Sequence, residues 1–228
     1  MSHPTRIKIC CIASPDEARM AIDAGVDAIG LVSRMPSGPG PIPLERIAEI
    51  ARGVPTSVET FLLTCETIGA KVVEQLEATG CNTVQLCDAM AEETDAYATI
   101  RAAHPSVRVV QVIHVEDELA LDEAFRIGPH VDALLLDSGR PRASTKGGVK
   151  ELGGTGRPHD WTLSRRVVGA EAFAHVLVWL AGGLTPANVG EAIRTATPHG
   201  VDVCTGVRTD GKLDPEKLNA FVAAVRGA

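Results

Sequence analysis

Two side chains in this sequence have the type and position needed for acid–base chemistry, the thiol of Cys10 and the carboxyl of Asp137. Cys10 shares one face of an alternating stretch with Lys8 and is followed by a helix start, which places the thiol at the end of a strand. Asp137 closes the apolar run 133–136. A thiolate can accept a proton, and a carboxyl kept partly protonated by burial can donate one. The alternatives are a buried core pair of Cys10 and Cys11 and a capping role for Asp137.

Two glycine-bearing turns have the pattern of phosphate sites. Segment 181–186 contains Gly182 and Gly183, and segment 203–207 contains Gly206. Glycine lets backbone amides approach a phosphate, and a helix that starts nearby adds a favourable dipole. The alternative is that both segments are ordinary strand-to-helix turns.

A long segment at 139–159 is basic in an otherwise acidic sequence, with Arg140, Arg142, Lys146, Lys150 and Arg157. Segments of this length without periodicity are usually lids or disordered. The basic cluster suits an anionic ligand, and the alternative is a solvated basic loop.

The elements that must position these groups alternate regularly along the chain. Strands are expected at 6–13, 27–33, 57–64, 83–87, 107–115, 133–137, 176–181 and 201–204. A helix is expected after each strand, and the helix after the sixth strand is expected over 160–172. Eight strand–helix units predict an α/β fold, a closed (β/α)₈ barrel forming one domain over 1–228. A doubly wound sheet is the alternative, but no GxGxxG turn follows the first strand. In a barrel the C-terminal ends of the strands meet at one mouth, which would bring Cys10 and Asp137 together.

Composition limits the possible partners. A net charge of −7 argues against nucleic-acid binding, and no apolar run is long enough to span a membrane. The six cysteines lack metal-ligand spacing, and no signal peptide is recognisable. These features predict a cytoplasmic protein with reduced thiols.

Five motifs occur in an order that is similar to the phosphoribosylanthranilate isomerase family: Lys8-Ile9-Cys10, Leu135-Leu136-Asp137-Ser138, Gly153 to Trp161, Ala181 to Val189, and Gly200 to Val203. The resemblance covers nearly the whole chain. It implies a (β/α)₈ barrel that performs an Amadori rearrangement of a small phosphoribosyl substrate, with no metal or organic cofactor, as a monomer or homodimer.

The resemblance also implies roles for individual residues. Asp137 would be the general acid that opens the ribose ring, and Cys10 the general base. Substrate and phosphate contacts would come from Gly154, Gly182, Gly183, Asp202, Thr205 and Gly206.

The sequence departs from the family at several positions. Cys11 stands where the family has glycine, Cys87 where it has histidine, Cys204 where it has serine and Arg208 where it has an acid. The loop at 37–42 lacks the arginine that binds the anthranilate carboxylate in the family.

Losing that charged contact would cost about 2–3 kcal/mol of binding unless Arg34 or an arginine of 139–159 replaces it. Two alternative functions follow, an isomerase for a different phosphoribosyl amine and a non-catalytic phosphosugar-binding barrel.

Overall fold

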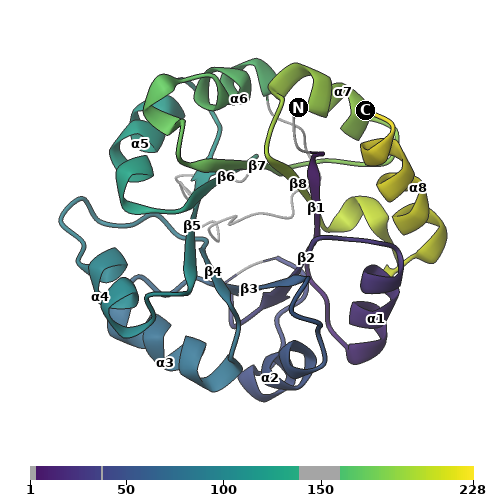
Figure 1. Cartoon of the computed structure of the whole chain (residues 1–228), viewed down its shortest axis with the longest axis horizontal. Helices are drawn as coiled ribbons and strands as arrows, with labels where there is room; N and C mark the ends of the chain where they lie inside the picture. Colours follow the sequence, from purple (N-terminus) through teal and green to yellow (C-terminus); the bar gives the residue numbers. More distant parts are fainter. Residues whose placement is uncertain (1–3, 37, 139–159) are drawn as a thin grey trace, which may run out of the picture.

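The computed structural model, which describes residues 4–36, 38–138 and 160–228, is a closed parallel barrel surrounded by helices (Figure 1). Its strands are β1 (Arg6–Ile9), β2 (Ala28–Val32), β3 (Glu59–Thr64), β4 (Thr83–Leu86), β5 (Arg108–His114), β6 (Ala133–Asp137), β7 (Leu177–Leu180) and β8 (Gly200–Val203). The strands follow one another in sequence order, and β1 pairs with β8 to close the sheet. The (β/α)₈ barrel predicted from the alternation is confirmed.

The helices are α1 (Pro15–Asp23), α2 (Leu44–Arg52), α3 (Gly69–Thr79), α4 (Ala96–Ala103), α5 (Leu119–Ile127), α6 (Trp161–Val168), α7 (Val189–Ala196) and α8 (Pro215–Arg226). Residues next to the helices determine where several of them begin and end. Ser14 caps α1 by accepting a hydrogen bond from the amide of Glu17 at 3.2 Å, and Asp214 caps α8 in the same way. Gly80 ends α3 with a left-handed φ of 68°, which glycine adopts at little cost.

The barrel has two apolar layers because strand side chains alternate between its faces. Ile7, Ile9 and their equivalents on other strands pack outward against the helices. Inward-facing residues fill the barrel, where the rings of Phe61 and Trp179 meet edge to face at 5.6 Å. Gly200 leaves space for Trp179, since a Cβ there would lie 2.5 Å from the indole ring.

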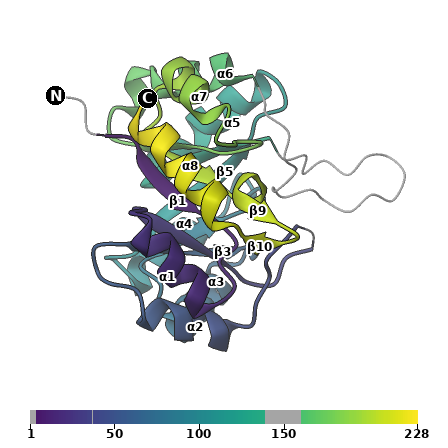
Figure 2. The ribbon, with the colours of Figure 1, turned by 90° about the vertical axis from the view of Figure 1, so that its right-hand side faces the viewer.

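The structure differs from the sequence expectation at two places. The helix expected over 160–172 is shorter, because α6 ends before Gly169 and a separate 3₁₀ turn, Glu171–Phe173, follows. A small antiparallel hairpin of β9 (Arg208–Thr209) and β10 (Lys212–Leu213) precedes α8 and was not expected. Figure 2 shows this hairpin on the side of the barrel opposite the two chain ends.

Among the described residues, no helix has the length and apolar character needed to cross a membrane.

Candidate active site

A cavity opens at the C-terminal ends of the strands, where the predicted site residues were expected. Its polar lining comes from β1, β4, β6, β7 and β8 and the turns after them: Cys10, Cys11, Gln85, Cys87, Asp137, Gly182, Gly183, Asp202, Cys204 and Thr205. Its apolar wall includes Val32, Met35, Leu63, Leu135, Ala181 and Leu184. The structure therefore brings Cys10 and Asp137 to one cavity although they are far apart in the sequence.

Cys10 lies directly after β1 and is buried. Its amide donates to the carbonyl of Val203 at 2.8 Å, so the pairing of β1 with β8 fixes its backbone. Gly30 on β2 makes room for the thiol, because a Cβ at that position would lie 3.1 Å from Cys10 Sγ. Strand pairing and a neighbouring glycine thus hold the sulfur at the cavity wall.

Asp137 is the last residue of β6, and its side chain is also buried. Burial raises the pKa of Asp137 from its ordinary 3.8 to about 6, although a hydrogen bond from the Ser138 amide at 2.7 Å acts in the opposite direction. The negative charge of Asp202 also raises this pKa. A carboxyl with such a pKa is partly protonated near neutral pH and can serve as a proton donor.

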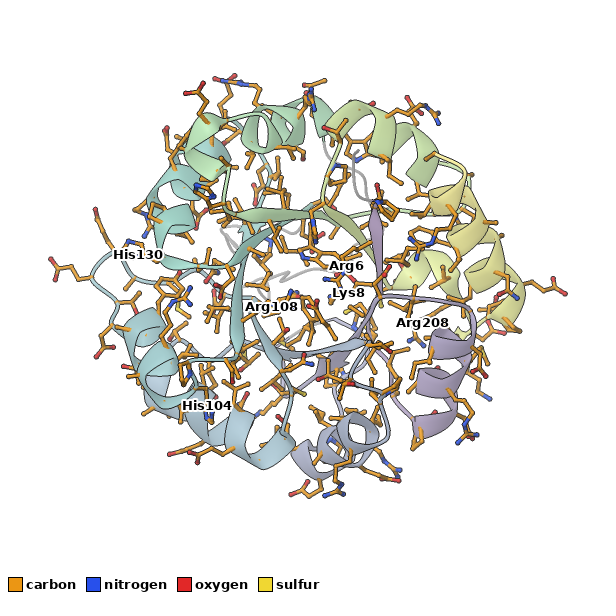
Figure 3. The ribbon with its side chains drawn as sticks, in the orientation of Figure 1. Arg6, Lys8, His104, Arg108, His130 and Arg208 are labelled. Carbon is orange, nitrogen blue, oxygen red and sulfur yellow. The ribbon has the colours of Figure 1, made fainter. Side chains whose placement is uncertain are left out.

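Lys8 extends into the barrel below the cavity and is completely buried (Figure 3). Its Nζ donates to Asp202 Oδ2 at 2.8 Å and to Gln85 Oε1 at 3.0 Å. Burial alone would lower the pKa of Lys8, but the charge of Asp202 and the hydrogen bond to it raise the pKa above its usual range. Lys8 therefore stays protonated and holds Asp202, which lines the cavity, from inside the barrel.

The second carboxylate oxygen of Asp202 has no partner among the described residues. Oδ1 is buried without a hydrogen bond, while Oδ2 is held by Lys8. An unpaired buried acceptor is costly, so a hydroxyl or amine of a ligand would be favoured next to it. This geometry fits the substrate-orienting role predicted for Asp202.

The two glycine turns pack against each other beside the cavity. Gly182 and Gly183 have φ angles of 83° and 63°, a conformation that glycine adopts readily. A Cβ on Gly206 would lie 2.0 Å from the carbonyl oxygen of Leu184, so only glycine fits there. Among the described residues, no acceptor bonds the amides of Gly183 or Gly206, which leaves them available to a phosphate.

Three of the predicted binding residues are not placed in the lining of the cavity. Gly206 packs against Leu184 beside it. The side chain of Arg34 is exposed and does not line it, and Gly154 lies outside the described residues. The basic residues of 139–159 also lie outside the described part of the chain. Within that part, no arginine or lysine lines the cavity wall.

Several neighbours of the site were not predicted from the sequence. Cys11 has a φ of 62°, and its Sγ lies 2.7 Å from Cys204 Sγ. Arg208 lies beside the start of α1 and donates to the carbonyl of Cys11 at 2.6 Å and to Glu17 Oε1 at 3.0 Å (Figure 3). The alternation of residues in the first strand already indicated that Lys8 lies on the same face as Cys10. The contact between Cys11 and Cys204 could not be predicted in this way, because it depends on the pairing of β1 with β8.

A (β/α)₈ barrel that brings a buried carboxyl and a thiol together beside two glycine turns fits the class of sugar-phosphate isomerases. Comparison with known proteins narrows this class. Residues 7–224 match the family model described as N-(5'phosphoribosyl)anthranilate (PRA) isomerase. The chain belongs to this family.

Curated relatives and solved structures agree with the assignment. The chain is 37% identical to N-(5'-phosphoribosyl)anthranilate isomerase of Haloferax volcanii, with 98% of this chain and 94% of the relative covered. It is 33% identical to the isomerase of Methanocella arvoryzae, with 97% and 98% covered. The structure resembles TrpF from Jonesia denitrificans with a TM-score of 0.72 at 32% identity, covering 98% and 97% of the two chains. The resemblance seen in the sequence motifs is confirmed.

Proposed function

We propose that this protein catalyses the Amadori rearrangement of N-(5′-phosphoribosyl)anthranilate to 1-(2-carboxyphenylamino)-1-deoxyribulose 5-phosphate, a step of tryptophan biosynthesis. The observation that carries the proposal is the convergence of Cys10 and Asp137 on one cavity, with burial raising the pKa of Asp137 to about 6. Family membership and full-length relatives that are named for this activity support it.

In the proposed mechanism Asp137 protonates the ribose ring oxygen. The bond from that oxygen to C1 breaks while the nitrogen lone pair forms a Schiff base with C1. Cys10 as thiolate then removes the proton from C2, and the electron pair of that bond gives the enolamine. Tautomerisation of the enolamine yields the aminoketose product.

The remaining cavity residues would position the substrate. The amides of Gly183 and Gly206 would bind the phosphate together with Gly182, Thr205 and the predicted contact at Gly154 outside the described residues. Asp202 Oδ1 would accept a hydrogen bond from the substrate while Lys8 holds Oδ2 of the same carboxylate. These groups restrain the ribose between the acid and the base.

Steady-state assays of wild type, Cys10→Ser and Asp137→Asn test the proposal. Each substitution nearly preserves side-chain size, and loss of a general acid or base typically costs 10²–10⁴-fold in rate. Cys65→Ser is the control, since Cys65 is half-buried and does not line the cavity. Undiminished turnover in either site variant would contradict its role, and phosphate binding by wild type without turnover would favour a phosphosugar-binding barrel.

The missing arginine of loop 37–42 favours a second candidate, an isomerase for a phosphoribosyl amine without the carboxylate. The test compares kcat/KM for the anthranilate-derived substrate with kcat/KM for its aniline counterpart. If Arg34 or an arginine of 139–159 binds the carboxylate, the aniline substrate should lose 2–3 kcal/mol, roughly 30- to 150-fold in kcat/KM. Equal reactivity would support the second candidate.

A related isomerase from Thermotoga maritima is described as dimeric, at 25% identity and a TM-score of 0.76. For this chain, a monomer or homodimer and a cytoplasmic location remain predictions. Sedimentation analysis and cell fractionation test them.

A further inference from the structure

Three thiols lie in a row where β1 and β8 end, and the proposed reaction uses one of them. Cys11 Sγ lies 2.7 Å from Cys204 Sγ and 3.7 Å from Cys10 Sγ. All three cysteines are in the thiol form. Within the described ranges, no group of three His, Cys, Asp or Glu residues is arranged to hold a metal ion. Neighbouring thiols outside a metal site are candidates for redox chemistry.

The backbone holds Cys11 in this position. Its φ of 62° is left-handed, which costs a residue with a Cβ roughly 1–2 kcal/mol. Such strain persists only where the surroundings fix it. Arg208 supplies that restraint by donating to the carbonyls of Cys11 at 2.6 Å and Cys10 at 3.2 Å, while Glu17 holds the guanidinium. The approach of Cys11 to Cys204 is therefore built into the turn.

The two thiols differ in access and in acidity. Cys204 is half-buried and Cys11 is buried, and both line the open cavity. The hydrogen bond between them lowers the pKa of Cys204 in spite of its burial, and the guanidinium of Arg208 acts in the same direction. Hydrogen bonds with Cys10 and Cys204 raise the pKa of Cys11. Cys204 is therefore the thiol suited to react first, and Cys11 is suited to resolve the product.

We propose that Cys204 is a modification site for low-molecular-weight disulfides and that Cys11 converts the adduct into a Cys11–Cys204 disulfide. The Cys204 thiolate attacks a disulfide RSSR, forms the mixed disulfide and releases one RS⁻. Cys11, losing its proton, attacks Cys204 Sγ and releases the second thiolate. Two protein thiols are oxidised and one RSSR is reduced to two RSH. The sulfurs need to approach by only roughly 0.7 Å to reach the bond length of about 2.05 Å.

Oxidation would act on the active site through Cys10. When Cys204 is protonated, its thiol donates to Cys11 Sγ, and the single S–H of Cys11 donates to Cys10 Sγ; a disulfide removes this donor. A hydrogen bond to a charged group stabilises that group. Loss of the bond to the Cys10 thiolate should therefore lower turnover roughly tenfold or more. This consequence rests on the proposed role of Cys10 as base, whereas formation of the disulfide does not.

The experiment uses the full chain, reduced and then incubated with increasing glutathione disulfide. Remaining thiols are alkylated, and tryptic peptides are analysed by mass spectrometry without reduction. Peptide 9–19 contains Cys10 and Cys11, and peptide 195–208 contains Cys204. Wild type and the control Cys65→Ser should give the linked pair 9–19/195–208 and regain activity with dithiothreitol. Cys11→Gly and Cys204→Ser should give no linked pair.

Two results would overturn the disulfide: glutathione remaining on Cys204 without a linked pair, or a linked pair that persists in Cys11→Gly. Cys10→Ser separates the two proposals, because it should still form the linked pair. If Cys10→Ser forms the pair and keeps full turnover, the proposed base fails while the modification stands. A wild-type disulfide that leaves turnover unchanged would refute the effect on the active site.

Discussion

Asp137→Asn should change stability and activity in opposite directions. Burial raises the pKa of Asp137 from 3.8 to about 6, which corresponds to about 3 kcal/mol at 1.36 kcal/mol per pH unit. Between these values the folded protein binds more protons than the unfolded chain, so the free energy of unfolding falls as pH rises. Asparagine carries no charge and can still accept the hydrogen bond from the Ser138 amide. The stability of the variant relative to wild type should therefore increase by about 2.4 kcal/mol from pH 4 to pH 7.5, because part of the full 3 kcal/mol is already present at pH 4.

Urea denaturation of both proteins at several pH values between 4 and 7.5 measures this difference. Asp16→Asn is the control, since it removes a carboxylate that is 88% exposed and so reports the general effect of one less negative charge. Activity of Asp137→Asn should fall by 10²–10⁴-fold while its stability rises. A stability difference between Asp137→Asn and wild type that does not change with pH would refute the reasoning.

Three further substitutions have definite expected outcomes. Lys8→Met leaves the buried carboxylate of Asp202 without its cation and should cost about 3–5 kcal/mol in urea denaturation at pH 7.5; a neutral effect would mean that the pair is not ionised. Gly206→Ala places a Cβ 2.0 Å from the carbonyl of Leu184, so calorimetry should show inorganic phosphate binding weakened at least about tenfold. Unchanged phosphate affinity would place the phosphate elsewhere. Cys11→Gly removes the strain of a positive φ and should stabilise the reduced protein by about 1 kcal/mol in urea denaturation. A lower urea midpoint than wild type would show that the contacts of the Cys11 thiol stabilise the fold by more than the backbone strain destabilises it.

The pattern of apolar strands and helix signals predicts most of this fold, because each strand–helix unit is encoded locally. Alternation in β1 also predicts that Lys8 and Cys10 share a face, and the structure places both inside the barrel. The hairpin before α8 could not be predicted in this way, since each of its strands has only two residues and carries no periodic pattern.

The sequence predicts those site residues that lie at the ends of strands. Cys10, Asp137 and Asp202 follow from the barrel rule that C-terminal strand ends meet at one mouth. The contact of Cys11 with Cys204 does not, because it depends on the β1–β8 register and on one left-handed residue. Nor does the raised pKa of Asp137 follow from its position in the sequence, since its value depends on how completely the assembled barrel excludes water.

The pairing of Lys8 with Asp202 also constrains how the chain can fold during synthesis. The two residues are 194 positions apart, so at about 5–20 residues per second the ribosome makes the carboxylate roughly 10–40 s after the lysine. An ammonium group cannot be buried without its counter-charge except at high cost. The first strand of a nascent chain must therefore stay hydrated at Lys8 until the last strand emerges. Closure of the barrel and burial of this charge pair are therefore expected to occur together, late in folding.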